Sequence, residues 1–161
     1  MKIVRHDKKK RATPAARSSP LASPACELCA QTGGRLLWRD AACRVVLVAD
    51  PAYPGYCRVI WNAHVREMTN LAAAERRHCM HVVFAVEQVL RAALDPHKIN
   101  LASLGNLTPH LHWHVIPRYE NDPHFPNSIW GERLRAENNR TAAKSASKLG
   151  KLLTAELAKS L

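Results

Sequence analysis

The first half of the chain alternates short apolar segments with turn-forming residues. Three segments have the length and the β-branched content of strands: Leu36–Arg39, Cys43–Ala49 and Cys57–Trp61. The second segment, CRVVLVA, is nearly all apolar, as expected for a buried strand. The loop between the last two segments contains two prolines and a glycine, which are typical of turns. We therefore predict three consecutive strands.

A long amphipathic helix is predicted next, from Leu71 to Leu94, with Thr69 or Asn70 as its cap. Its apolar residues repeat at three- and four-residue steps, which places them on one face: Cys79, Val82, Val83, Val86, Val89, Leu90 and Ala93. Two more strands follow, Lys98–Leu104 and Leu111–Ile116. The order β-β-β-α-β-β predicts an α+β fold, an antiparallel sheet of about five strands with one long helix packed across it.

The two ends of the chain differ in composition from its middle. Residues 1–24 are rich in Lys, Arg, Ser and Pro, so we expect a disordered basic tail before a single domain at 25–130. Residues 131–161 form a basic extension, in which Leu149, Leu153 and Leu157 indicate an amphipathic helix, although Gly150 disfavours one.

Charge and hydropathy limit the classes of partner that the sequence predicts. The net charge of +11 divides into +6 for residues 1–20, +4 for residues 131–161 and +1 for the remainder. This distribution predicts no basic globular face, and we expect the tails to be solvated rather than bound to nucleic acid. Because no segment resembles a membrane span or a secretory signal, we expect a cytoplasmic protein without membrane contact.

The five cysteines do not form the pattern of a disulfide framework. Cys43, Cys57 and Cys79 lie in apolar segments and are interpreted as small core residues. Cys26 and Cys29 form a Cys-x-x-Cys pair, which is typical of metal sites and of redox pairs. A redox pair usually follows a strand and begins a helix, whereas this pair precedes a Gly-Gly turn with no strand before it.

Three histidines alternate along the last predicted strand, at His110, His112 and His114. Alternate residues of a strand share one face, so the imidazoles point to one side and the apolar residues between them to the other. Successive histidines lie about 6.5–7 Å apart along the strand. Three in a row cannot easily share one metal, so we expect them to have different roles.

This segment, PHLHWHVIPR, resembles the signature of the histidine-triad superfamily. The similarity extends to Asn100–Asn106 before the strand, and to Pro54-Gly55 and the segment Val59–His64, in which Trp61 replaces the usual proline. It covers roughly residues 26–120. The resemblance implies the family's fold, which is usually a homodimer, and agrees with the order of elements predicted above.

The resemblance also implies roles for individual residues. His112 is expected to attack the α-phosphorus of a nucleotide and form a nucleotidyl-histidine that water then hydrolyses. Its other ring nitrogen should donate to a backbone carbonyl and fix the tautomer. His114 is expected to contact the phosphate oxygens, and Asp50 to hold the ribose hydroxyls.

The loop before the triad departs from the family. Many members carry a hydroxyl residue three positions ahead of the first histidine, where this chain has Leu107. Thr108 follows one position later, and Asn106 stands where glutamine is usual. Asn106 and Thr108 are therefore predicted to contact the phosphates, whereas Leu107 offers no hydroxyl to protonate the leaving group.

By the same resemblance, Cys26, Cys29, His64 and His110 are expected to bind one zinc ion. Two thiolates and two imidazoles complete a tetrahedral shell without a position for substrate, so this zinc is expected to be structural.

Three functions follow from these residues. The first is a hydrolase for a dinucleoside polyphosphate or a nucleoside phosphoramidate. The second is a zinc-stabilised nucleotide-binding module with little turnover, which the altered loop favours. The third is a nucleotidyl transferase, although the transferase branch of the superfamily has glutamine in place of the third histidine, so His114 favours water as the acceptor.

Overall fold

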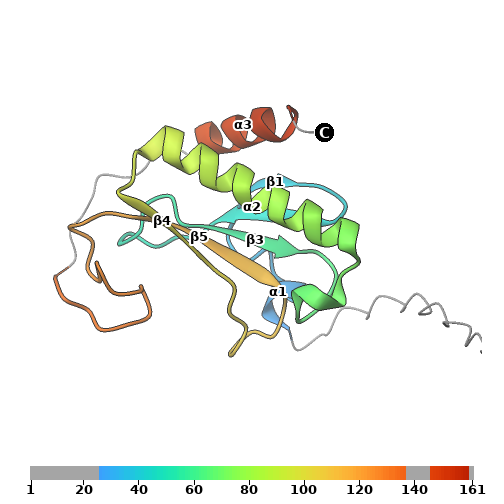
Figure 1. Ribbon diagram of the computed structural model, residues 1–161, viewed down its shortest axis with the longest axis horizontal. Helices are drawn as coiled ribbons and strands as arrows, with labels where there is room; N and C mark the ends of the chain where they lie inside the picture. Colours follow the sequence, from blue (N-terminus) through green and yellow to red (C-terminus); the bar gives the residue numbers. More distant parts are fainter. Residues whose placement is uncertain (1–25, 137–145, 160–161) are drawn as a thin grey trace, which may run out of the picture.

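The computed structural model describes residues 26–136 and 146–159. Five strands form one antiparallel sheet in the order β1-β2-β3-β5-β4: β1 Arg35–Arg39, β2 Cys43–Leu47, β3 Cys57–Trp61, β4 Lys98–Ala102 and β5 His112–Arg118. The helices are α1 Glu27–Ala30, η1 Met68–Asn70, α2 Ala73–Leu94 and α3 Ala146–Leu157. The α+β prediction is confirmed, with α2 packed across one face of the sheet (Figure 1). The predicted tail lies outside the described residues.

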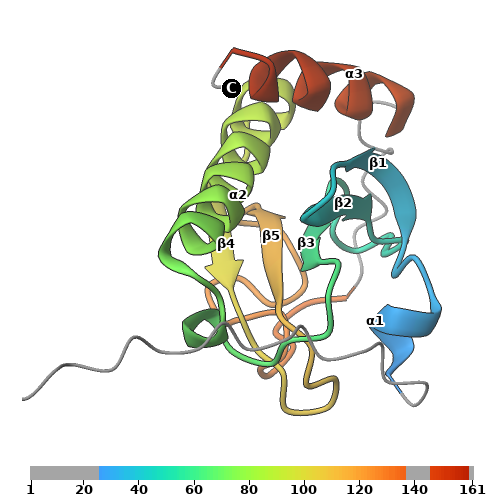
Figure 2. The same ribbon diagram turned by 90° about the vertical axis from the view of Figure 1, so that its right-hand side faces the viewer.

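The main core lies between α2 and the sheet (Figure 2). Alternate residues of the central strands point to this side, and the predicted apolar face of α2 covers them. Three cysteines interpreted as core residues are 0–1% exposed here: Cys43, Cys57 and Cys79. Two more buried residues, Leu111 and Val115, flank the histidines in sequence. The apolar side of the histidine strand therefore faces α2, as predicted.

The opposite face of the sheet carries two smaller apolar clusters. Cys26 and Leu28 of the α1 segment pack on Val46 and Ile60 of the central strands. Tyr53 and Tyr56 form the second cluster, with Ala52 and Ile116. The histidines lie on this second face, between the two clusters.

The prediction of a side-chain cap for the long helix was wrong. Thr69 and Asn70 belong to the separate 3₁₀ turn η1, where the Asn70 side chain accepts from the N–H of Glu67. Leu71 is extended, so α2 begins only at Ala73, and Glu75 accepts the N–H of Ala72 at 2.6 Å. Polar residues just ahead of an apolar pattern therefore marked a preceding turn rather than the helix cap.

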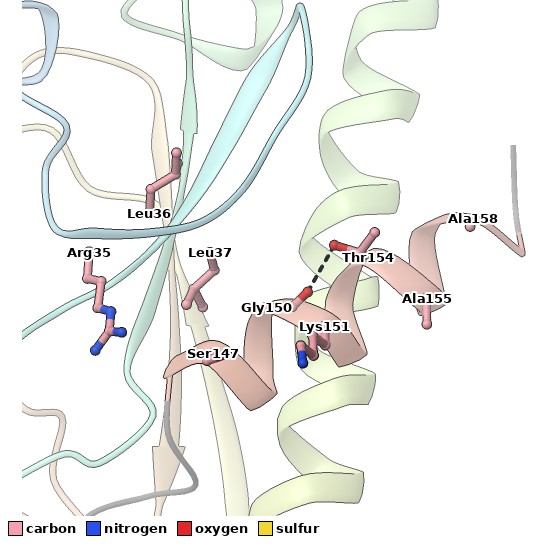
Figure 3. Close-up of a pocket in the computed structure, with 9 residues that line it drawn as sticks. All are labelled: Arg35, Leu36, Leu37, Ser147, Gly150, Lys151, Thr154, Ala155 and Ala158. Atoms are coloured by element: carbon pink, nitrogen blue, oxygen red, sulfur yellow. Dashed lines mark hydrogen bonds between the residues drawn. The ribbon is translucent and has the colours of Figure 1, made fainter.

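The C-terminal extension forms α3, which packs against α2 and β1. Leu149, Leu153 and Leu157 are 1–2% exposed and complete the main core. Gly150 faces the carbonyl oxygen of Leu37, and a Cβ added at this position would lie 3.1 Å from that atom (Figure 3). The glycine that disfavoured a helix in sequence permits its close approach to the edge strand.

An open groove of about 550 Å³ is lined by residues of both α3 and β1. Arg35, Leu36 and Lys151 are among its lining residues, and none of the predicted site residues is (Figure 3). Within the described ranges, no helix combines the length and hydropathy needed to cross a bilayer.

Candidate functional site

The histidine strand places its imidazoles on the face away from α2. His112 and His114 belong to β5 and lie opposite Ile60 and Arg58 of β3, respectively. His110 lies two residues before the first residue of the strand and is fully buried, whereas His112 is 6% and His114 is 5% exposed. Each of the three rings has different neighbours.

The ring of His112 is held by the backbone of its own strand. Its Nδ1 lies 2.6 Å from the carbonyl oxygen of His110. Because a carbonyl oxygen only accepts, Nδ1 must carry a proton. Burial lowers the pKa of His112, and nearby Arg58 acts in the same direction, so the neutral ring keeps its lone pair on Nε2. This is the tautomer that a nucleophilic histidine needs.

His114 lies beside His112, with their ring centroids 4.7 Å apart. Its Nδ1 is 2.5 Å from the hydroxyl oxygen of Tyr56. Trp130 packs edge-on against its ring, with the ring centroids 5.0 Å apart. Burial, His112 and Arg58 lower the pKa of His114 to about 3. The ring is therefore uncharged at neutral pH and can offer an N–H from one nitrogen only.

The four residues expected to hold zinc come together from three separate parts of the chain. Cys26 Sγ lies 3.4 Å from Nδ1 of His110, and Cys29 Sγ lies 3.3 Å from Nδ1 of His64. All four ligand atoms lie within 4.8 Å of one another. Nε2 of His110 donates to the carbonyl of Trp61 at 2.7 Å, which directs Nδ1 towards the thiols.

A second group of possible ligands, Asp40, Cys43 and His78, has a structural role. Asp40 Oδ1 accepts the N–H groups of Ala42 and Cys43 in the turn between β1 and β2. Its Oδ2 lies 2.6 Å from Nε2 of His78 on α2. The carboxylate therefore joins this turn to the helix.

The predicted substrate contacts occupy two different places. Asp50 lines a pocket of about 340 Å³ together with Tyr56 and Trp130, both of which contact His114. Its Oδ1 accepts the N–H of Ala52. Asn106 is exposed and Thr108 is half-buried in the loop before β5. Across residues 26–136 and 146–159, neither of these two side chains hydrogen-bonds a triad histidine.

Sequence reasoning missed several residues of this site. Arg58 of β3 and Tyr56 just before that strand have the parity of the histidine face, but their proximity to His114 depends on β3 pairing with β5, which does not follow it directly in sequence. Trp130 belongs to an irregular segment. Asp122, in the same segment, accepts two hydrogen bonds from the guanidinium of Arg118, at 2.6 and 3.0 Å.

Comparison with known proteins agrees with this geometry. A family model described as HIT domain matches residues 30–121. AP-4-A phosphorylase of Mycobacterium tuberculosis, in strains CDC 1551 / Oshkosh and ATCC 25618 / H37Rv, is 28% identical over 107 residues. The match covers 63% of this chain and 55% of the relative, so the chain spans about half the length of these curated relatives.

Solved structures share the fold. A histidine triad protein from Marinobacter aquaeolei VT8 has a TM-score of 0.64 at 24% identity, covering 83% of this chain and 94% of that one. One from Bradyrhizobium japonicum has a TM-score of 0.60 at 24% identity, covering 80% and 91%. A Zn-bound histidine triad family protein from Mycobacterium smegmatis has a TM-score of 0.57 at 21% identity, covering 84% and 94%. The family model spans more than half of the sequence, and on that match the chain belongs to the HIT domain family.

Proposed function

We propose that the protein is a nucleotide hydrolase that cleaves at the α-phosphorus, with a dinucleoside polyphosphate or a nucleoside phosphoramidate as substrate. The observation that carries this proposal is the 2.6 Å contact between Nδ1 of His112 and the carbonyl of His110. It holds one ring nitrogen as a donor and leaves Nε2 as a nucleophile.

The proposed reaction has two displacements. Nε2 of His112 forms a bond to the α-phosphorus while the bond to the leaving group breaks with its electron pair. Water then attacks the same phosphorus and loses one proton to the solvent, the bond between phosphorus and Nε2 breaks with its electron pair returning to Nε2, and the mononucleotide is released. Burial raises the pKa of Tyr56, so its hydroxyl stays protonated and can donate to Nδ1 of His114. Nε2–H of His114 is then the donor for the phosphate oxygens.

The nucleoside is proposed to occupy the pocket beside His114. Asp50 supplies a carboxylate for the ribose hydroxyls, and Tyr53 and Trp130 supply aromatic surface for the base. Asn106 and Thr108 remain proposed contacts of the phosphate chain, and their loop would have to approach the substrate when it binds.

Intact-mass spectrometry after brief incubation with a panel of nucleotides tests the mechanism. The wild-type protein should gain the mass of one mononucleotide, and the best donor identifies the substrate. His112→Asn should give no adduct and should lower turnover by a factor on the order of 10⁴. His97→Asn is the matched control, because that ring is about half exposed and lies outside the site. A His112→Asn variant retaining a tenth of the activity refutes the proposal.

A transferase is the second candidate, because a relative bears the name AP-4-A phosphorylase. Inorganic phosphate would then replace water in the second displacement and release a nucleoside diphosphate. The products formed with and without phosphate separate the two reactions. Nucleotide binding without any adduct would instead favour the binding module, in agreement with Leu107, which is 98% exposed and offers no hydroxyl.

We further propose that Cys26, Cys29, His64 and His110 hold a structural zinc ion. Bonds of about 2.3 Å to sulfur and about 2.0–2.1 Å to nitrogen, at tetrahedral angles, separate neighbouring sulfur and nitrogen ligands by about 3.6 Å. The observed separations of 3.3 and 3.4 Å are close to that value. The donor set therefore fits zinc.

Metal analysis of protein purified without a chelator should find about one zinc per chain. Cys26→Ser should lose the zinc and much of the stability, whereas His114→Ala should keep the zinc. Metal-free protein with a melting temperature unchanged by added zinc would contradict the site.

The protein is also proposed to be a homodimer. Strand β4 forms one edge of the sheet, and Phe84 and Leu104 are nearly half exposed. Light scattering coupled to size exclusion gives the mass directly, and a monomer at working concentration would contradict this proposal.

A further inference from the structure

Arg58 lies in the wall of the histidine site. It belongs to β3 and pairs across the sheet with His114, so the two side chains share one face. Its guanidinium carbon lies 5.8 Å from the centroid of the Tyr56 ring, the same ring that hydrogen-bonds His114. Arg58 also lines the pocket that contains Asp50.

The guanidinium of Arg58 differs from those of the two most buried arginines. Arg44 donates to the backbone carbonyls of Leu28, Gln31 and Thr32. Arg118 forms a two-bond pair with a carboxylate. By contrast, the one side-chain hydrogen-bond partner of Arg58 within the described residues is the Tyr56 hydroxyl, its Nε is buried without any partner, and no carboxylate of the described segments forms a salt bridge with this residue.

Arg58 is half-buried, but its Nε is shielded from water, and a donor in that position without an acceptor is costly. An imidazole is never an anion, so the rings of His112 and His114 do not compensate the charge of the guanidinium. An anion in the site would supply both the acceptor and the counter-charge. A planar guanidinium suits phosphate in particular, because its N–H groups match two phosphate oxygens.

We propose that Arg58 binds the phosphate oxygens of the substrate, on the same group that His114 faces. This inference rests on the proposed function and extends it, because Arg58 supplies a charged donor in a chain whose loop has Leu107 in place of a hydroxyl residue. Loss of Arg58 should then weaken the part of binding that comes from the phosphate group and leave the part that comes from the nucleoside nearly unchanged.

Binding of adenosine 5′-monophosphate and of adenosine, measured by calorimetry, tests the assignment. Arg58→Leu should weaken the affinity for the monophosphate roughly 10- to 100-fold, because a charge-assisted hydrogen bond to the phosphate is lost. The affinity for adenosine should stay within about threefold of the wild-type value. Arg58→Lys should bind the monophosphate more tightly than Arg58→Leu but less tightly than the wild type, since an ammonium group keeps the charge but lacks the two parallel N–H donors of a guanidinium. Added KCl should weaken monophosphate binding more in the wild type than in Arg58→Leu.

Arg35→Leu is the matched control, because that arginine is exposed on the edge strand β1. It should leave both affinities unchanged, and the melting temperatures of all variants show whether they are folded. Equal weakening of adenosine and monophosphate by Arg58→Leu would overturn the proposal, as would no weakening of either.

Inorganic pyrophosphate separates this proposal from the proposed function. If the wild type binds pyrophosphate but no nucleotide, and Arg58→Leu abolishes that binding, the Arg58 assignment stands and the nucleotide hydrolase does not. If the wild type binds neither class of probe, both are overturned.

Discussion

Replacing Asp122 with alanine should destabilise the protein strongly, because its carboxylate is the partner of a buried arginine. The side chains of Arg118 and Asp122 are 2% and 1% exposed, and two hydrogen bonds of 2.6 and 3.0 Å join them. The same carboxylate accepts the N–H groups of His124 and Phe125. It therefore ties the irregular segment that carries Trp130 to the last strand.

The expected loss follows from what Asp122→Ala leaves behind. Removing one partner of a buried ion pair typically costs about 3–5 kcal/mol, since the other charge stays buried. For a chain of this size, that corresponds to a fall in melting temperature of about 10 °C. Glu120→Ala is the matched control, because the Glu120 side chain is 73% exposed and forms its ion pair with the exposed His97, so its loss should cost less than about 1 kcal/mol.

Urea unfolding followed by tryptophan fluorescence measures both variants. A loss below about 1 kcal/mol in Asp122→Ala, or an equal loss in the two variants, would refute the reasoning. The first result would mean that Arg118 finds other acceptors. Two are already present, the Asn100 side chain and the Asn127 carbonyl, at 2.6 and 2.8 Å.

Three further predictions concern pH, the core and a turn. Burial alone would raise the pKa of Asp122, but Arg118 and backbone N–H groups outweigh that effect and hold the pKa low. The stabilisation that the carboxylate provides is therefore complete above about pH 4 and is lost as the pH falls through the pKa of the folded state. The difference in unfolding free energy between the wild type and Asp122→Asn should shrink on acidification, and a constant difference would contradict this. Leu153→Ala should cost about 2–5 kcal/mol and the half-exposed Leu152→Ala less than about 1 kcal/mol in the same urea assay, and similar losses would contradict the packing of α3. Gly34→Ala should lower the melting temperature more than Gly105→Ala. Gly34 has a φ of 152°, and a Cβ added there would lie 2.6 Å from a backbone carbonyl oxygen, whereas a Cβ added at Gly105 would lie 3.7 Å from its nearest atom. Equal falls in melting temperature would contradict this reasoning.

Local periodicity predicted the secondary structure because each element buries one face. The apolar repeat of α2 and the alternation on β5 both follow from burial against the same core, so each pattern is visible without knowledge of the fold. The ends of elements were less predictable. The β2 prediction extended to Ala49, whereas the strand ends at Leu47, because apolar composition continues past the last pairing with β3.

The surroundings of the histidines could not be predicted in the same way. Cys26 and His110 are separated by 84 positions, and only the family resemblance joined them in sequence. The positions of Tyr56 and Arg58 in the site could be predicted only from the pairing of β3 with β5. These two strands are not consecutive in the sequence, so no tight turn between them indicates that they pair. Trp130 lies in a segment without periodicity, held by the charge pair of Arg118 and Asp122 rather than by an apolar pattern.

The register of β5 connects stability with the chemistry of the site. A shift by one residue would turn every side chain of a strand to the other face, so it would place Trp113 and Val115 on the histidine side and the imidazoles in the main core. Val115 is fully buried under α2, and that burial resists the shift. The carbonyl that orients His112 belongs to His110, whose own ring is held by the Trp61 carbonyl. Burial of the apolar side of the strand thus keeps the proposed nucleophile His112 on the site face, while the His110 carbonyl fixes its tautomer from the preceding turn.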